Sequence, residues 1–264
     1  MKPTLSIVIV EYKSTEEIAH CIKSISAVLN LPYEIIVSSN SCYTDSERAH
    51  ITKENAYDNV HWLFNERNGG FAYAMNEGLK VAKGDYLVIM NSDCSINSDL
   101  SQMISFLKEH QEVGALGPCI HDADGNLQDT ARPYVSVTRF FWRQIKRMLL
   151  HKVSVLNPNM DYTKTQTVDW VIGAFIMVTR KAYELTGGLD DSFFMYAEDL
   201  DWCTRIRQKG LEIVYYAPSD ITYKGTRRAR NNKKYAKIFL HSHLMYWRKY
   251  GYVFGYPKRK KMMF

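Results

Sequence analysis

Three acidic side chains stand close together in the segment FFMYAEDLDWCTRIRQKG, residues 193–210. Glu198, Asp199 and Asp201 open a predicted helix, where the helix dipole stabilises negative charge. The surrounding aromatic residues suit a general base, because an apolar setting raises the affinity of a carboxylate for a proton, and they can stack on a sugar face. Arg205 follows Asp201 by one helical turn and can pair with it. We therefore expect Asp201 to be structural and Glu198 or Asp199 to face a ligand.

A further carboxylate, Asp93, follows an apolar run that ends in the tetrapeptide MNSD, residues 90–93. A lone carboxylate repels phosphates, whereas one that holds Mg²⁺ or Mn²⁺ lets the metal bridge to phosphate oxygens and neutralise a leaving diphosphate. Asp also commonly caps turns. The tetrapeptide alone therefore leaves two roles open for Asp93, a metal ligand and a turn cap.

Two glycines, Gly69 and Gly70, stand directly before a predicted helix that runs from about 71 to 83. The helix carries short side chains, so it can approach a sheet or a ligand closely, and its first N–H groups are available to an anion. No Gly-Lys-Ser/Thr sequence follows, which excludes a Walker loop. A glycine turn with tight helix packing explains the segment as well as a nucleotide contact does.

Alternating apolar runs and helical patterns predict the scaffold that positions these residues. A helix opened by Ser14, with Glu17 three residues on as in a capping box, follows the first run. In the first half of the chain the predicted strands are 5–10, 33–39, 60–64 and 85–91. Strands separated by helices imply a parallel sheet with helices on both faces, which binds ligands beyond the carboxyl ends of its strands.

The second half of the chain has a different character. Loop signals and a basic aromatic stretch occupy 117–167, and strand-like runs follow at 170–178 and 211–216, with a helix beginning near Ala197 between them. The sequence contains no internal repeat and no linker rich in Pro or Gly. One compact α/β domain with a C-terminal extension is the simplest interpretation.

Charge is distributed very unevenly over the 264 residues. All 28 Asp and Glu lie at or before Asp220, whereas residues 224–264 carry 13 of the 34 Lys and Arg. The first 223 residues therefore hold 21 Lys and Arg against 28 Asp and Glu. An acidic body with a basic end indicates a tail that faces anions such as phospholipid head groups or nucleic acid.

The five cysteines and the N-terminal residues predict the compartment. The cysteines are scattered and form no C-x-x-C pair, which indicates free thiols in a reducing environment. The first apolar run spans only residues 5–10 and Glu11 follows at once, which is too short for a signal peptide or a membrane span, and no later run reaches the length of about 20 apolar residues that a span needs. We expect a cytoplasmic protein.

Three segments taken together resemble the family 2 inverting glycosyltransferases, and are most similar to the bacterial rhamnosyltransferase-type members. They are SIVIVEYK, then NGGFAYAMNEG with MNSD, then VDWVIGAFIMVTRKAYELTGGLDDSFFMYAEDLDWCTRIRQKG. The resemblance covers roughly residues 4–225 and implies the GT-A fold, with a mostly parallel central sheet and helices on both faces. It implies a domain over 1–225, whose halves 1–115 and 116–225 bind nucleotide and acceptor. The composition of the remaining residues predicts a basic aromatic helical extension over 226–264.

The resemblance also implies roles for individual residues. Asp199 would be the general base with Glu198 beside it, and Asp93 would bind a divalent cation, Mg²⁺ or Mn²⁺. The acceptor site would contain Trp170, Gly173, Ala174 and Tyr196. The donor site would contain Val10, Glu11, Tyr12, Ser39, Asn40, Asn68, Gly70, Phe71, Asn76, Asn91, Ser92 and Asp93.

Two positions depart from the family pattern. Ser39 stands where the family usually has an Asp that can meet the base, and Tyr223 is the nearest match to a His that completes the metal site in many relatives. Tyr is protonated at neutral pH and is a poor ligand for Mg²⁺ or Mn²⁺. Either Asp93, the diphosphate and water suffice to hold the metal, or Lys224 and Arg227 supply part of its charge, or the protein is a catalytically impaired binder of sugar nucleotides.

Two basic segments suggest a membrane partner. RFFWRQIKRMLLHK, residues 139–152, alternates cations with bulky apolar groups, and the tail repeats this pattern. Each alone is typical of a solvated face on a core helix, but the pair favours peripheral attachment to an anionic membrane, such as the inner face of the cell membrane.

The predicted reaction is transfer of a sugar, with inversion, from a UDP- or dTDP-sugar to a hydroxyl of a saccharide acceptor in surface polysaccharide synthesis. The resemblance implies that this acceptor is lipid-linked. A nucleotidyltransferase would need a glycine-rich basic loop near the first strand, where VEYKSTEE offers only Lys13. The tail has no zinc, RNP or helix-turn-helix signature, so no nucleic-acid partner is expected.

Overall fold

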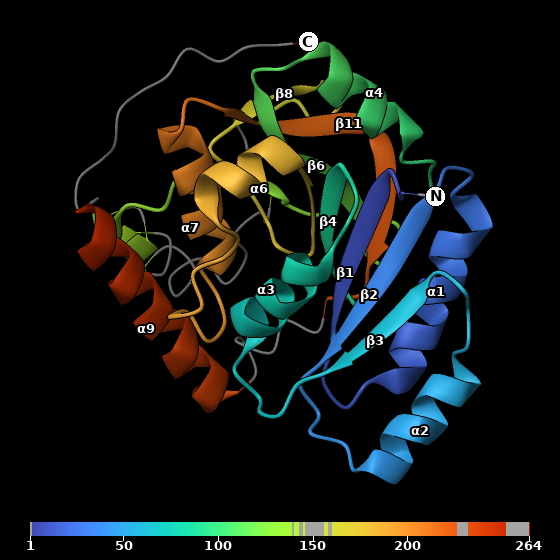
Figure 1. Cartoon of the computed structure of the whole chain (residues 1–264). Helices are drawn as coiled ribbons and strands as arrows, with labels where there is room; N and C mark the ends of the chain where they lie inside the picture. The colour runs from blue at the N-terminus through green and yellow to red at the C-terminus, as the bar shows by residue number, and fades with distance from the viewer. Residues whose placement is uncertain are drawn as a thin grey trace.

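A mixed sheet of nine strands forms the centre of the computed structural model, which describes residues 2–138, 140–142, 145, 156–157, 160–225, 232–251 and 264 (Figure 1). From one edge to the other the strands are β3 (Val60–Phe64), β2 (Tyr33–Ser39), β1 (Leu5–Glu11), β4 (Tyr86–Asn91), β10 (Phe175–Thr179), β6 (Val113–His121), β11 (Glu212–Tyr223) and β5 (Cys94–Ile96). The short strand β8 (Gln166–Val168) also pairs with β11.

The N-terminal strands pair in parallel, as the alternating pattern predicts. In the register of β1, Glu11 lies opposite Ser39 of β2, and Val10 lies opposite Asn91 of β4. The carboxyl ends of these strands therefore meet at one edge of the sheet. Beyond β4 the sheet becomes mixed, because β10 runs antiparallel to both β4 and β6, while β11 is parallel to β6.

Helices cover both faces of the sheet, which confirms the expected α/β architecture. Successive residues of a strand point to opposite faces, so Ile7 and Ile9 pack on one side and Val8 packs on the other. The first side is covered by α1 (Thr15–Val28) and α4 (Ser101–Glu109). The second is covered by α3 (Phe71–Val81), α6 (Arg180–Thr186), α7 (Glu198–Gln208) and α9 (Lys233–Tyr250).

The expected capping box at the first helix is wrong. Ser14 occupies the N-cap position of α1 but its side chain makes no capping hydrogen bond, and its backbone N–H donates to Glu11 Oε1 at 2.8 Å. Glu17 instead accepts a hydrogen bond from Ser92 Oγ at 3.3 Å. The capping box of this half lies at α2 (Asp45–Glu54), where Thr44 and Glu47 bond reciprocally. In a capping box the Glu17 side chain would accept the Ser14 N–H. Here the buried Glu11 carboxylate accepts that N–H instead.

The strand expected over 170–178 is split in two. Trp170–Val171 form β9, which pairs with β7 (Ala131–Arg132) in a separate two-stranded sheet, and β10 begins only at Phe175. The hydrophobic run hides this break because both pieces are buried. The residues between them, including Gly173, leave the sheet and become part of the site described below.

The basic tail contains the long helix α9, which lies along the outside of the molecule next to α7 (Figure 1). It begins after Asn232, whose side chain accepts from the backbone N–H of Lys234 at 2.9 Å, and ends at Gly251, which adopts the left-handed conformation with φ of 67°. Most of the basic stretch 139–152 and of the remaining tail lies outside the described residues.

Two further expectations concern the cysteines and membrane-spanning helices. All five cysteines are free thiols, as predicted. In the part of the chain that the structure describes, none of the helices has the length and apolar character needed to cross a bilayer.

Candidate active site

The carboxylate of Glu11 organises the loop that follows β2. Glu11 is completely buried and accepts hydrogen bonds from the hydroxyls of Ser39, Ser41 and Tyr43 as well as from the Ser14 N–H. Ser41 donates at 2.9 Å to one carboxylate oxygen and Tyr43 at 3.1 Å to the other. Glu11 therefore fixes the predicted donor-binding loop from below. It also places a carboxyl group directly beside Ser39, the position where the resemblance led us to expect an Asp.

Asn40 ties this loop to the start of α3. Its side-chain amide donates to the Gly70 carbonyl at 2.9 Å, while its own oxygen accepts from Asn65 Nδ2 at 3.0 Å. Asn68 Oδ1 in turn accepts from the Gly70 N–H at 3.1 Å. Because the buried Asn40 bonds through both its amide nitrogen and its oxygen, it ties the loop after β2 to the loop between β3 and α3. Val10 is half-buried, whereas Tyr12 is 43% exposed and Asn68 is also exposed, so Tyr12 and Asn68 are accessible to a ligand.

The start of α3 is pinned to the loop that leads into α7. Gly70 has a φ of 92°, and a Cβ there would lie 2.2 Å from the Phe194 carbonyl oxygen, so glycine is required on two grounds. That same carbonyl accepts the Phe71 N–H at 2.8 Å. Asn76 donates to the Leu189 carbonyl at 2.7 Å and accepts from its N–H at 2.9 Å. The Phe71 amide and the Asn76 side chain, predicted to shape the nucleotide pocket, thus bond to the other half of the molecule.

Asp93 lies in the turn between β4 and β5, beside Tyr223. Burial, followed by the negative charge of Asp93, raises the pKa of Tyr223, so this phenol remains protonated. Its OH lies 3.4 Å from Asn91 Nδ2, and the Lys224 N–H donates to the Asp93 carbonyl at 3.1 Å. The strand end that carries Asn91, Ser92 and Asp93 is thus next to Tyr223, the residue expected in place of a metal-binding His.

Asp199 is joined to the same strand end through a loop between β9 and β10. The Gly173 N–H donates to Asp199 Oδ2 at 2.8 Å, and the Leu200 N–H donates to Oδ1 at 2.8 Å. The next residue, Ala174, accepts the Asn91 N–H at 3.0 Å through its carbonyl. Consecutive residues of one loop therefore bond to the predicted base and to the strand that ends at the predicted metal ligand.

The two neighbouring carboxyl groups at the start of α7 have pKa values above their ordinary range. Burial raises the pKa of Asp199, although hydrogen bonds from Gly173 and Leu200 partly oppose the shift. Burial, together with the charge of Asp199, raises the pKa of Glu198 further above its usual range. Within the described residues, Glu198 Oε2 is buried without a hydrogen-bond partner. Burial and the repulsion between the two groups therefore favour the protonated form of each, most strongly at Glu198.

Arg132 is a candidate site residue that the sequence did not reveal. Its positive charge lowers the pKa of Asp199, and its guanidinium lies over the Trp170 ring, 5.3 Å from the centroid. Arg132 Nε donates to the Asp129 carbonyl at 3.0 Å. The arginine stands in a short strand within a stretch of loop signals, where neither periodicity nor a motif singles it out. Its register opposite Trp170, which brings it to the site, is a tertiary feature.

The predicted acceptor residues lie around this cluster. Trp170 is buried and donates from Nε1 to the Pro133 carbonyl at 3.0 Å, while Ala174 is also buried. Tyr196 has a positive φ of 70° and packs edge-on against Phe239 of α9, with ring centroids 5.4 Å apart. Helix α9 therefore supports Tyr196 and the segment that leads into α7.

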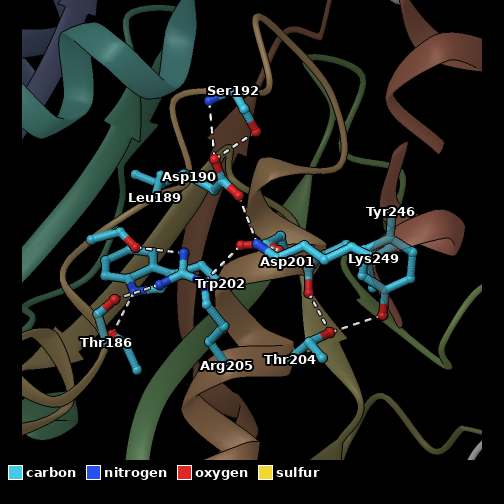
Figure 2. A network of polar contacts seen from close by, with 12 residues as sticks. Thr186, Leu189, Asp190, Ser192, Asp201, Trp202, Thr204, Arg205, Tyr246 and Lys249 are labelled. Carbon is cyan, nitrogen blue, oxygen red and sulfur yellow. Dashed lines mark hydrogen bonds and ion pairs between the residues drawn. The ribbon is translucent and has the colours of Figure 1, made fainter. Parts of the chain in front are cut away.

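Asp201 has the structural role expected of it, and Figure 2 shows the polar network around it. The side chain is completely buried and accepts from Arg205 Nε at 2.7 Å, from Lys249 Nζ at 2.7 Å and from the Tyr250 hydroxyl at 2.8 Å. Lys249 also reaches Asp190 at 2.6 Å. This network joins α7 to α9 and to the loop before α7, so it fixes the helix that carries Asp199.

A second cluster of potential metal ligands lies away from Asp93. Among the described residues, the group of three His, Cys or acidic side chains close enough to share an ion is Cys119, His121 and Asp220, on β6 and β11. His121 Nδ1 faces Asp220 at 2.6 Å. Asp93 is not part of this group, and it offers one carboxylate. One carboxylate with phosphate oxygens and water is an ordinary environment for Mg²⁺, so the residues at Asp93 fit such an ion.

Curated relatives include several rhamnosyltransferases. The chain is 24% identical over 243 residues to the N-acetylglucosaminyl-diphospho-decaprenol L-rhamnosyltransferase of Mycobacterium tuberculosis, covering 84% of this chain and 76% of that protein. It is 23% identical over 190 residues to the dTDP-rhamnosyl transferase RfbF of Shigella flexneri, covering 70% of this chain and 57% of that protein.

Solved structures with the same fold are GT-A glycosyltransferases. GalNAc-T7 with UDP, GalNAc and Mn²⁺ gives a TM-score of 0.61 at 18% identity, over 84% of this chain and 44% of that one. The mannosyltransferase PcManGT of Pyrobaculum calidifontis with GDP-Man and Mn²⁺ gives 0.58 at 17% identity, over 86% of this chain and 59% of that one. The chain thus spans less than two thirds of either protein, and the likeness establishes the GT-A fold.

The family model described as glycosyl transferase family 2 matches residues 6–186. This range includes the Glu11 loop, the start of α3, the Asp93 turn and the Gly173 loop that bonds to Asp199. The chain belongs to glycosyl transferase family 2.

Proposed function

We propose that this glycosyltransferase moves a sugar, with inversion at the anomeric carbon, from a UDP- or dTDP-sugar to a hydroxyl of a lipid-linked saccharide in surface polysaccharide synthesis. The observation that carries the proposal is the bonding of Gly173 to Asp199 and of the adjacent Ala174 to Asn91. It brings a carboxylate of raised pKa close to the strand edge where the family binds its donor. The rhamnosyltransferase relatives make dTDP-rhamnose the first donor to test.

In the proposed reaction Asp199 is the general base. Its carboxylate accepts the proton of the acceptor hydroxyl while the hydroxyl oxygen attacks the anomeric carbon. The bond from that carbon to the diphosphate oxygen breaks, and the nucleoside diphosphate leaves with the bonding electrons. Attack opposite the leaving group inverts the anomeric configuration. The Gly173 N–H holds the base in position, and burial keeps its proton affinity high.

The donor side is assigned to the strand-end loops. The loop 39–43, held by Glu11, would contact the nucleobase together with Tyr12. A divalent cation held by Asp93 would neutralise charge on the diphosphate, and the protonated Tyr223 would contribute a hydrogen-bond donor beside it. Arg132, stacked on Trp170 near Asp199, is suited to binding the acceptor or the transferred sugar. We place this reaction in the cytoplasm.

A panel of nucleotide sugars, each with and without Mn²⁺, tests donor binding by thermal shift. The true donor raises the melting temperature, since a ligand at about 100 times its Kd adds roughly 2.7 kcal/mol to the free energy of unfolding. Asp93→Ala should abolish the Mn²⁺-dependent part of this shift, whereas Asp124→Ala, at an exposed site, should preserve it. A wild-type donor affinity that does not change with Mn²⁺ would remove Asp93 from the metal site.

Product analysis separates the proposed enzyme from a binding protein. With the donor found by the panel and a polyprenyl-diphosphate saccharide as acceptor, the wild type should release nucleoside diphosphate and form an inverted glycoside. Donor binding without transfer and without slow hydrolysis would identify an impaired binder, the alternative suggested by Ser39 and Tyr223.

A further inference from the structure

The inner face of helix α9 packs against the elements that carry the candidate active site. Its buried residues are Ser242, His243, Tyr246 and Trp247. Ser242 donates to the Met195 carbonyl at 2.8 Å, Trp247 donates to the Val135 carbonyl at 2.6 Å, and the Tyr246 hydroxyl lies 2.9 Å from Thr204 Oγ1. With the Lys249 and Tyr250 contacts to Asp201, these bonds fix α9 against α7 and its preceding loop.

The outer face of α9 combines cations with leucines. Leu240 and Leu244 are 42% and 51% exposed, although leucine side chains are normally buried in a globular protein. Exposed cations precede and follow them along the same helix: Lys233, Lys234, Lys237 and Arg248. Positions 237, 240, 244 and 248 recur at helical spacing, so Lys237, Leu240, Leu244 and Arg248 lie on one stripe of the surface.

A second exposed apolar group lies on the neighbouring segment. Phe140 packs against Phe239 and Trp247 of α9, with ring centroids 6.0 and 5.2 Å away. The following residues Phe141, Trp142 and Ile145 are 49%, 60% and 44% exposed. Five of the eleven large apolar side chains exposed in the described residues therefore belong to α9 and to a segment that packs on it. We call these five residues and the four α9 cations the basic apolar face.

We propose that the basic apolar face docks the protein on an anionic lipid bilayer. Residues 224–264 carry 13 Lys and Arg and no Asp or Glu, a charge that complements anionic head groups. Exposed Trp, Phe and Leu beside Lys and Arg are the composition of helices that lie in the membrane interface. A second copy of the chain would bring like charges together, and nucleic acid would leave the leucines and Trp142 without apolar partners.

Docking would also orient the active site. The inner face of α9 bonds to Met195, packs on Tyr196 and binds Asp201, on either side of Asp199 in the sequence. Lipid on the outer face would therefore be separated by α9 alone from Met195 and Tyr196, in the segment that leads to Asp199. This part of the inference rests on the proposed lipid-linked acceptor, whereas bilayer binding itself does not.

Sedimentation of the full chain with vesicles tests the inference. The wild type should bind to vesicles of phosphatidylglycerol mixed with phosphatidylcholine. It should bind far less to vesicles of phosphatidylcholine alone. The triple variant Lys233→Gln, Lys234→Gln, Lys237→Gln should lose roughly a hundredfold in partition coefficient, since each adsorbed lysine contributes about fivefold. Equal binding of the wild type to both vesicle types would overturn the proposal.

A matched pair of double variants distinguishes the face from a general effect of charge. Leu240→Glu with Leu244→Glu should reduce vesicle binding at least tenfold, whereas Val81→Glu with Leu185→Glu, which are 49% and 45% exposed on α3 and α6, should leave it within twofold. Unchanged vesicle binding by the Leu240→Glu, Leu244→Glu variant would overturn the proposal. If these two substitutions instead dissociated a dimer and left vesicle binding unchanged, the face would be a contact between two copies of the chain. The donor-induced thermal shift should be the same in all variants, so its absence reports on the proposed function alone.

Discussion

The two sides of the candidate site both bury a carboxyl group, but they surround it differently. On the proposed nucleotide side, the Glu11 carboxylate accepts hydrogen bonds from four donor groups, three side-chain hydroxyls and the Ser14 N–H. On the proposed acceptor side, one oxygen of the buried Glu198 has no partner among the described residues, and Asp199 accepts hydrogen bonds from two backbone N–H groups. Glu11 is thus well supplied with hydrogen-bond donors, whereas burial raises the pKa of both Glu198 and Asp199.

The contrast also separates two carboxylates of one helix. Asp201 meets a guanidinium, an ammonium and a hydroxyl, whereas Asp199, half a turn earlier, meets no cation at hydrogen-bond distance in the described contacts. Neutralised carboxylates are poor bases because their charged form is already stabilised. This contrast supports a scaffold role for Asp201 and is consistent with the proposal that Asp199 is the general base.

Asp199→Asn should produce the largest effect. The amide keeps the shape of the side chain but cannot accept a proton, so the transfer rate should fall by about 10²–10⁴. Donor affinity, measured by the thermal shift, should change less than twofold. Asp191→Asn, at an exposed position in the preceding loop, is the matched control and should transfer at the wild-type rate. Full activity of Asp199→Asn would exclude this residue as the base.

Asp201→Asn should instead destabilise the fold. The variant leaves Arg205 and Lys249 without their buried counter-charge, and loss of one partner of a buried pair costs about 3 kcal/mol. Denaturant unfolding measures the loss. Asp190→Asn removes the more exposed partner of Lys249 and should cost less than about 1 kcal/mol, as for surface ion pairs. Equal losses in the two variants would contradict the special role of Asp201.

Glu198→Gln should change how stability depends on pH. The pKa of Glu198 is raised in the folded state, so its contribution to stability is complete below the unfolded pKa and is lost as pH rises through the folded value. Glutamine does not ionise, so unfolding free energy of the variant minus that of the wild type should increase from pH 4 to pH 8, by about 1.4 kcal/mol for each unit of the shift. Denaturant titrations across this range, with exposed Glu16→Gln as control, provide the measurement. A flat difference would show that Glu198 ionises normally.

The sequence predicted the scaffold better than the contacts of the site. The alternation of apolar runs and helices located the parallel strands, and the helix dipole with Arg205 identified the structural role of Asp201. The capping box at Ser14 was wrong because the buried Glu11 competes for the same donor, and the break at Gly173 was missed because both flanking segments are apolar. Arg132 was also missed, because only its pairing opposite Trp170 brings it to Asp199.

Tyr43→Phe should have the smallest effect, and the size of that effect tests whether Glu11 is over-satisfied. The substitution removes one hydroxyl donor at 3.1 Å, while Ser39, Ser41 and the Ser14 N–H still bond to the carboxylate. The expected loss is about 1 kcal/mol in the free energy of unfolding, the usual contribution of one hydrogen bond. Tyr57→Phe, at a tyrosine that is 44% exposed, should change stability by less than about 0.5 kcal/mol. A loss at Tyr43 as large as that of Asp201→Asn would mean that the remaining donors to Glu11 cannot compensate for the missing hydroxyl. The number of hydrogen bonds to each carboxyl group would then not explain the difference between the Glu11 region and the Glu198–Asp199 region.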